Sequence, residues 1–118
     1  MSKQQEHDLH VINLATLLRR SGQYHIIETH VPYYDQAITR GEIDVVAIGY
    51  ETFDLYEVKV SAMRGNFQEA VRQLRTARNY FSQLGSDFIY TPQHRIESLD
   101  AVVQRLNLRM RHKQKQDI

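Results

Sequence analysis

Two apolar stretches that contain charged residues constrain the fold of this 118-residue chain more than any other feature. Residues 43–48 (IDVVAI) and 54–60 (DLYEVKV) are rich in Val and Ile, which is typical of strands covered on both faces. Asp44 interrupts the first stretch, and Glu57 and Lys59 interrupt the second. Because side chains alternate along a strand, Glu57 and Lys59 are expected to share one face. Such charges are costly to bury unless they are paired or bind a metal, so the pattern predicts a polar site inside a sheet.

The composition is typical of one globular domain covering residues 1–118. Apolar residues make up 42% of the chain and charged residues 25%. The absence of cysteine excludes a disulfide scaffold, a thiolate zinc site and a cysteine nucleophile. No apolar run reaches the roughly 18 residues of a membrane span, and the polar start does not resemble a signal peptide. We therefore expect a cytoplasmic protein that does not associate with membranes.

Hydrophobic periodicity predicts the element order α-β-β-β-α-β-α. Helices are expected at residues 4–20, 67–84 and 98–112, and strands at 24–31, 43–48, 54–60 and 87–91. Pro32 is expected to interrupt the first strand, and a loop is expected from Tyr33 to Arg40. Short connections between the first three strands favour an antiparallel meander, and a helical crossover favours parallel pairing of the fourth. The expected fold class is α/β, with a mixed central sheet flanked by helices and a C-terminal helix.

The ends of the helices are predicted from capping residues. Helix starts are expected from capping boxes and helix ends from glycines: Ser2 with Gln5, Asn66 with Glu69, Gly22 and Gly85. After the last helix, a basic tail at about residues 110–118 is expected to fray.

The two central strands bring a plausible metal-binding set together if they pair. Two carboxylates on rigid strands, Asp44 and Glu57, suit a hard cation such as Mg²⁺, which completes its shell with water and substrate phosphate. The backbone carbonyl of Val58 is a further candidate ligand. Such a metal activates a bound water and polarises a phosphoryl oxygen. The ammonium of Lys59 would orient that water or stabilise the developing charge, so the set suffices for hydrolysis of a phosphodiester.

The sequence GEIDVVA at residues 41–47, followed by YEVK at residues 56–59, resembles the PD-(D/E)xK nuclease superfamily. This group includes restriction endonucleases and archaeal Holliday junction resolvases, and its common core matches the expected element order. The resemblance implies that Asp44 is the metal-binding aspartate, Glu57 the second acidic ligand and Lys59 the catalytic lysine. It covers nearly the whole chain except the last helix and the tail.

The resemblance leaves some positions open. Many members add a glutamate from the first helix as a metal ligand, and here Glu6 is the candidate, with Asp8 as a weaker one. Ile43 stands where the superfamily often has proline. Gln73 is followed four residues later by Ala77, so the Gln-xxx-Tyr motif of some relatives is absent, although Gln73 remains a candidate for contact with the site.

Basic side chains supply candidate contacts to a nucleic-acid backbone. The candidate DNA-binding residues are Arg20, Arg64, Arg72, Gln73 and Arg75, together with the basic tail. Such clusters bind phosphates and make affinity dependent on salt. The resemblance therefore implies a Mg²⁺-dependent endodeoxyribonuclease, with Mn²⁺ as a substitute, that acts in DNA recombination or repair. The compact build is most similar to a Holliday junction resolvase, which would bind branched or four-way DNA as a homodimer.

Two other functions remain open. A non-catalytic DNA-binding or partner-binding module that keeps the nuclease fold would bind metal weakly and cleave nothing. An RNA-directed nuclease would have no need for this carboxylate set, so metal dependence separates it from the first hypothesis. A histidine-based zinc site is disfavoured, because His25 and His30 lie five residues apart on an expected strand and so on opposite faces.

Overall fold

The computed structural model describes residues 1–116, and it describes side chains as far as residue 107. These residues form three helices and five strands: α1 (Lys3–Ser21), β1 (Ile26–Asp35), β2 (Ile38–Gly49), β3 (Thr52–Val58), α2 (Arg64–Arg78), β4 (Asp87–Thr91), β5 (Arg95–Ser98) and α3 (Leu99–Gln116). The strands form one sheet in the order β1-β2-β3-β4-β5. In it β3 pairs antiparallel with β2 and parallel with β4. The predicted mixed α/β fold is therefore confirmed.

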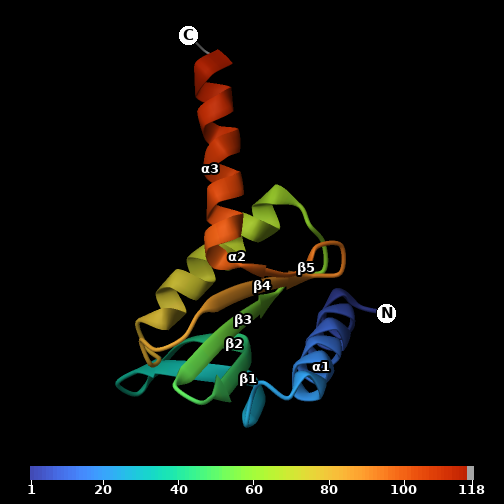
Figure 1. The fold of residues 1–118 in the computed structure, drawn as a ribbon, viewed down its shortest axis with the longest axis vertical. Coiled ribbons are helices and arrows are strands. Elements are labelled where there is room, and N and C mark those ends of the chain that lie inside the picture. The colour runs from blue at the N-terminus through green and yellow to red at the C-terminus, as the bar shows by residue number, and fades with distance from the viewer. Residues whose placement is uncertain (117–118) are drawn as a thin grey trace.

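Two apolar layers cover the sheet, with α1 on one face and α2 and α3 on the other (Figure 1). Val11, Leu14 and Leu18 of α1 pack with Tyr56 and Val58 of β3. On the opposite face, Leu55 of β3 and Ile89 of β4 pack with residues of α2 and α3 that include Phe67, Leu74 and Val102. This alternation along β3 explains why the central strands are apolar on both faces.

The predicted ends of α1 are confirmed. The Ser2 side chain accepts a hydrogen bond from the Gln5 N–H, and the Gln5 side chain accepts one from the Ser2 N–H. At the other end, Gly22 adopts a left-handed conformation with φ of 72°. The capping box and the glycine stop thus set the length of the helix that carries one wall of the site.

The predicted loop from Tyr33 to Arg40 is wrong, and Pro32 does not interrupt the first strand. Strand β1 continues through Pro32 to Asp35, and β2 already begins at Ile38, so the two strands form a long hairpin. Pro32 is tolerated because β1 lies at the edge of the sheet, where a missing N–H breaks no ladder on the outer side.

Helix α2 begins and ends earlier than predicted. It starts at Arg64, and the expected capping box does not form: Asn66 donates instead to the Ser61 carbonyl and hydroxyl oxygens. The helix stops at Arg78, whose guanidinium donates to the carbonyl oxygens of Phe53, Ser82, Leu84 and Ser86. The bonds to Ser82, Leu84 and Ser86 satisfy carbonyl groups of the segment after the helix, which follows a non-helical path. Gly85, the predicted stop, lies in that segment with φ of 113°.

The C-terminal part contains a strand that the sequence did not predict. The segment Arg95–Ser98 forms β5, which pairs antiparallel with β4 and leads directly into α3. The described helix α3 extends to Gln116, beyond the predicted end at residue 112. The side chains of residues 108–118, which include the predicted basic tail, lie outside the described part. Within the described residues, no helix has the length and apolar character needed to cross a membrane.

Candidate metal centre and nucleic-acid interface

The backbone pairing of the sheet is interrupted at Asp44. The β2–β3 ladder includes Val45 but not Asp44. The β1–β2 ladder pairs residues on either side of Asp44 and omits Asp44 itself and His30, the residue opposite. His30 has a φ of 53°, in the left-handed region that non-glycine residues seldom adopt. The sheet is therefore locally irregular at the position where the sequence placed a costly charge.

Side chains replace the missing backbone bonds at this point. The Asp44 N–H donates to Oε1 of Glu57 at 3.3 Å, and the Val58 N–H donates to Oδ2 of Asp44 at 2.8 Å. Both carboxyl groups belong to buried residues, with exposed fractions of 7% for Asp44 and 3% for Glu57. The structure thus brings together the two predicted acidic ligands.

The electrostatics of the pair favour a cation. Burial raises the pKa of Glu57 well above its usual value, and the charge of Asp44 raises it further. The Asp44 N–H and the charge of Lys59 lower the pKa of Glu57, but they do not offset the burial. A positive ion beside the two carboxyl groups would stabilise both in the charged form.

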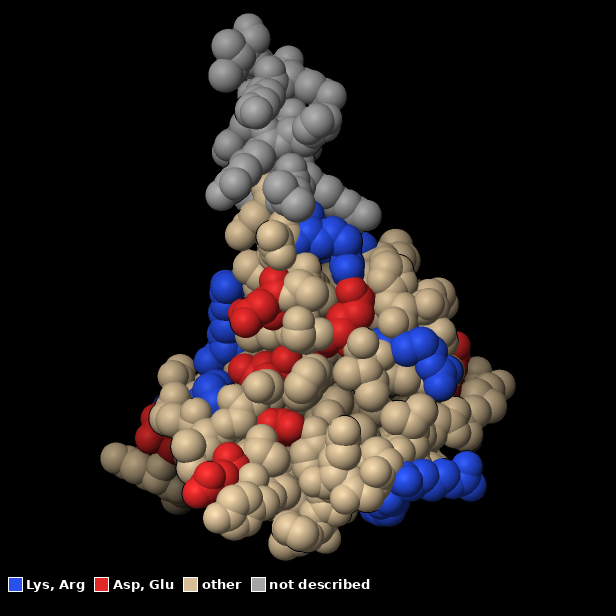
Figure 2. Space-filling view, in the orientation of Figure 1, with Lys and Arg blue, Asp and Glu red and all other residues tan. Residues whose placement is uncertain are grey.

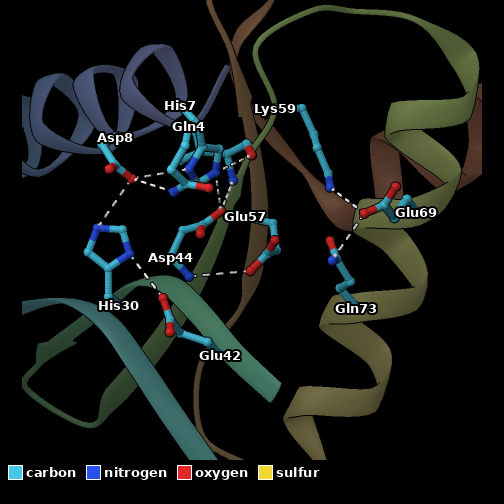
Figure 3. A network of polar contacts seen from close by, with 11 residues as sticks. Gln4, His7, Asp8, His30, Glu42, Asp44, Glu57, Lys59, Glu69 and Gln73 are labelled. Carbon is cyan, nitrogen blue, oxygen red and sulfur yellow. Dashed lines mark hydrogen bonds and ion pairs between the residues drawn. The ribbon is translucent and has the colours of Figure 1, made fainter. Parts of the chain in front are cut away.

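His7 lies at this position too, although the sequence did not point to it as a site residue. Its Nε2 lies 3.2 Å from Oδ2 of Asp44 and 3.2 Å from the carbonyl oxygen of Val58 (Figure 3). Because the carbonyl oxygen can only accept, Nε2 carries the proton in this arrangement. On the other side of the ring, Nδ1 lies 3.7 Å from Oδ1 of Asp8. The imidazole ring therefore lies between two oxygen atoms, Oδ2 of Asp44 and the Val58 carbonyl oxygen, on one side and the carboxylate of Asp8 on the other.

The structure places Glu6, the predicted helix ligand, away from this centre. Glu6 is exposed, whereas its neighbour His7 is half-buried against Asp44. His7 continues the buried stripe of Val11 and Leu14 at helical spacing. That spacing was the sequence signal available for His7. A histidine in line with buried apolar residues faces the sheet, whereas the preceding residue, Glu6, does not.

Lys59 lies near the carboxyl pair but contacts a different partner. Its Nζ lies 3.0 Å from Oε1 of Glu69 on α2, and this ammonium lowers the pKa of Glu69. Gln73 also donates to Oε1 of Glu69, and the other amide atom of Gln73, Oε1, is buried without a hydrogen-bond partner among the described residues. Figure 3 shows Lys59 on the α2 side of Glu57 and His7 on the α1 side.

The donor atoms fit an incomplete shell for a divalent cation. Among the described residues, no three His, Cys, Asp or Glu side chains are arranged to hold an ion, so His7, Asp44 and Glu57 would have to shift to bind one together. However, Oδ2 of Asp44 and the Val58 carbonyl oxygen converge on one point, because both lie 3.2 Å from the same atom of His7. Mg²⁺ needs only one or two carboxylates and takes the rest of its ligands from water and phosphate. These donor atoms therefore fit a metal centre in which water and substrate phosphate would supply the remaining ligands.

The candidate DNA-binding residues are spread over two helices. Arg72 and Arg75 are exposed on α2, while Arg64 and Gln73 are half-buried. Arg20 lies in the last turn of α1. A rise of about 1.5 Å per residue puts it roughly 20 Å along the helix from His7. The face in Figure 2 carries acidic groups across its middle and basic groups towards its margins. This face therefore presents no continuous basic surface among the described side chains.

Comparisons with known proteins add one structural likeness. The sequence matches no protein-family model and no curated protein. Among solved structures, the chain is similar to the small subunit of the heterodimeric restriction endonuclease R.BspD6I, with 15% sequence identity and a TM-score of 0.45. The match covers 71% of this chain and 47% of that subunit, so the chain spans about half of the subunit's length.

Proposed function

We propose that this chain is a metal-dependent endonuclease that hydrolyses phosphodiester bonds of DNA. The observation that carries the proposal is the meeting of Asp44 and Glu57 at an irregular position between central strands, beside the carbonyl of Val58. A structural carboxyl pair would gain little from this placement, because two like charges in a buried position disfavour each other. A site for a divalent cation gives the pair a physical reason.

The roles of the residues follow from their positions. Asp44 and the Val58 carbonyl would hold Mg²⁺ or Mn²⁺, and Glu57 would supply the second carboxylate. When bound, the metal would supply an activated water and polarise a phosphoryl oxygen. Lys59 would leave its present partner Glu69 when the substrate binds. From the α2 side of Glu57, its ammonium would then orient the attacking water or stabilise the developing charge.

In this proposal, His7 takes the role that the resemblance implied for Glu6. Binding of a cation between Asp44 and Val58 requires Nε2 of His7 to give up its proton or move away. Asp8, 3.7 Å from Nδ1, is placed to stabilise the tautomer in which Nδ1 carries the proton and Nε2 is free to coordinate. Since an imidazole ligand suits Mn²⁺ better than Mg²⁺, this residue favours use of Mn²⁺.

Preference for branched or four-way DNA and action as a homodimer are further parts of the proposal. They rest on the resemblance of the motif and on the small size of the chain. Exposed Arg72 and Arg75 on α2, the helix that also carries Glu69, are the candidates for contact with the DNA backbone.

The second candidate is a non-catalytic DNA-binding or partner-binding module. It is favoured by one observation: His7 satisfies Asp44, and Glu69 satisfies Lys59, without any added ion. In that case the charged groups would form a closed structural network. The two candidates differ in whether a metal changes the protein and the substrate.

The test is cleavage of labelled four-way junction, linear duplex and single-stranded DNA with Mg²⁺, Mn²⁺ or EDTA. The proposal predicts cleavage with metal, none with EDTA, and a loss of at least about 100-fold in Asp44→Asn and Lys59→Ala. Cleavage that survives EDTA would contradict the mechanism. DNA binding without cleavage under every condition would support the module instead. Equal rates on junction and linear duplex would remove the junction preference alone.

A further inference from the structure

His30 has an unusual backbone conformation for a residue inside a strand. Among the described residues, four other than glycine have a positive φ: His30, Gln36, Glu51 and Arg95. Gln36 and Glu51 lie in the turns that join neighbouring strands, and Arg95 begins β5 directly after a turn. Of these four, His30 is the one within a strand, in the middle of β1 and opposite Asp44. A glycine would adopt this conformation at no steric cost, so a histidine here indicates a use for its side chain.

The His30 imidazole joins acidic side chains of two different elements. Its Nδ1 lies 3.0 Å from Oε1 of Glu42 on β2, and its Nε2 lies 4.0 Å from Oδ1 of Asp8 on α1 (Figure 3). The side chains of His30 and Asp8 are 40% and 43% exposed, and ion pairs at such exposure add little to the stability of a fold. Stability therefore does not account for the strained histidine.

Asp8 is the acid that connects His30 to the candidate metal centre. Three nitrogen atoms lie around its Oδ1: Nε2 of Gln4 at 2.9 Å, Nδ1 of His7 at 3.7 Å and Nε2 of His30 at 4.0 Å. Gln4 and His7 belong to α1, as Asp8 does, so His30 is the contact among these three that ties Asp8 to the sheet. Because His30 lies opposite Asp44, this contact holds Asp8 in place relative to the strand that carries Asp44.

We propose that His30 is a positioning residue for the metal centre, which holds Asp8 beside Nδ1 of His7. This role rests on the proposed function, in which Asp8 stabilises the tautomer of His7 that leaves Nε2 free to coordinate a cation. The strained conformation of His30 directs the imidazole from the neighbouring strand towards Asp8. His30 acts through Asp8 and His7 and does not itself touch the ion. Outer residues that orient a ligand histidine contribute roughly 10- to 100-fold to metal affinity.

Replacement by asparagine removes the contact with Asp8 selectively. Asparagine adopts the left-handed region more readily than most residues, so His30→Asn should fold with the same backbone. Its amide nitrogen lies as many bonds from the backbone as Nδ1 of histidine, but no atom takes the place of Nε2. His30→Asn therefore keeps a donor for Glu42 and loses the contact with Asp8. His30→Gly, which adopts the same backbone without strain, removes both contacts and provides a second variant.

The experiment is titration calorimetry of the full chain with Mn²⁺ and with Mg²⁺, for wild type, His30→Asn, His30→Gly, Asp8→Asn and the double variant of His30→Asn with Asp8→Asn. Each single variant should weaken Mn²⁺ binding by about 10-fold and Mg²⁺ binding less, because the tautomer matters only to the imidazole ligand. The double variant should also lose no more than about 10-fold, since both changes break the same chain of contacts.

Gln36→Gly is the matched control. It also removes a left-handed residue other than glycine from the hairpin of β1 and β2, and it should leave both metal affinities unchanged. Urea denaturation in EDTA should show that His30→Asn and His30→Gly are at least as stable as wild type, because both relieve backbone strain.

The outcomes separate the role of His30 from the proposed function. Mn²⁺ binding to wild type that His30→Asn and His30→Gly leave unchanged would overturn the role of His30 alone. So would a double variant about 100-fold weaker than wild type, because His30 and Asp8 would then act independently. Equal losses of Mn²⁺ and Mg²⁺ affinity with a fall in urea stability would mean a structural role instead. Absence of Mn²⁺ binding to wild type would contradict the metal centre and the role of His30 together.

Discussion

Nε2 of His7 lies 3.2 Å from Oδ2 of Asp44, although 37 residues separate the two in the sequence. This contact joins α1 to the irregular position between the central strands. It also fixes the direction of Asp44, whose Oδ2 accepts a second hydrogen bond from the Val58 N–H. The proposed role of His7 in metal binding can be tested apart from catalysis.

Substitution His7→Ala should weaken Mn²⁺ binding by roughly 10- to 100-fold, the cost typical of residues that orient or complete a metal site. Mg²⁺ binding should weaken less, because Mg²⁺ prefers oxygen ligands. Titration calorimetry with each ion gives both affinities. His10→Ala is the matched control, because it removes the same type of side chain from the same helix and should change neither affinity. Equal affinities in wild type and His7→Ala would exclude His7 from the metal centre.

Glu57 should make the metal-free protein less stable as the pH rises. Its folded-state pKa is raised above the unfolded value of about 4.5, so the folded protein binds the extra proton between these two values. Stability therefore falls as the pH rises from about 4.5 through the folded pKa. Glu57→Gln should flatten this part of the curve and be the more stable protein at neutral pH. Urea denaturation at a series of pH values, in EDTA, checks this. Parallel curves for the two proteins would contradict the assignment.

Lys59→Ala should abolish cleavage while leaving metal affinity within about threefold of wild type. The reason is that Nζ contacts Glu69 on α2 rather than Asp44, so the proposed mechanism gives the lysine a contact with the substrate and not with the metal. Single-turnover rates and calorimetry separate the two effects. A loss of metal affinity as large as that of Asp44→Asn would mean that Lys59 supports the ligands instead.

Arg78 should be structural rather than DNA-binding. It forms an ion pair with Asp87 in which both side chains are largely buried, and it donates to the backbone of the segment between α2 and β4. Arg78→Ala should lower the free energy of unfolding by about 3 kcal/mol, since it leaves a buried carboxylate and several carbonyls without a donor. Exposed Arg72→Ala should change it by less than about 0.5 kcal/mol. Similar values in urea denaturation would refute this role.

Much of the fold follows from local signals in the sequence. The two central strands, the parallel fourth strand and both ends of α1 were predicted, because periodicity and capping act within a few residues. The antiparallel pairing of β1 and β2 was predicted, but the length of their hairpin was underestimated. Pro32 is disruptive only inside a sheet, and its edge position depends on the strand order. The early end of α2 was missed because Arg78 bonds to residues beyond the helix, which replaces the helical pattern.

The candidate site was predicted only in part for the same reason. Asp44 and Glu57 carry a local signal, a charge in an apolar strand, and the structure brings them together. His7 carries a weaker local signal, its helical spacing with the buried residues Val11 and Leu14. That spacing indicates that His7 faces the sheet, but not that it meets Asp44. Glu69 was assigned to a capping box, yet it binds Lys59 across the gap between strand and helix. Contacts between distant elements decide which partner each side chain meets, and spacing within one element does not identify that partner.

The most direct test of the central claim is a Mn²⁺ titration of wild type, Asp44→Asn and Glu57→Gln by calorimetry, without DNA. The account predicts one class of site in wild type. It predicts a loss of affinity of at least about 100-fold in Asp44→Asn and a smaller loss in Glu57→Gln. Circular dichroism would verify that the variants are folded. Absence of Mn²⁺ binding to wild type, or equal affinity in wild type and Asp44→Asn, would contradict the metal centre.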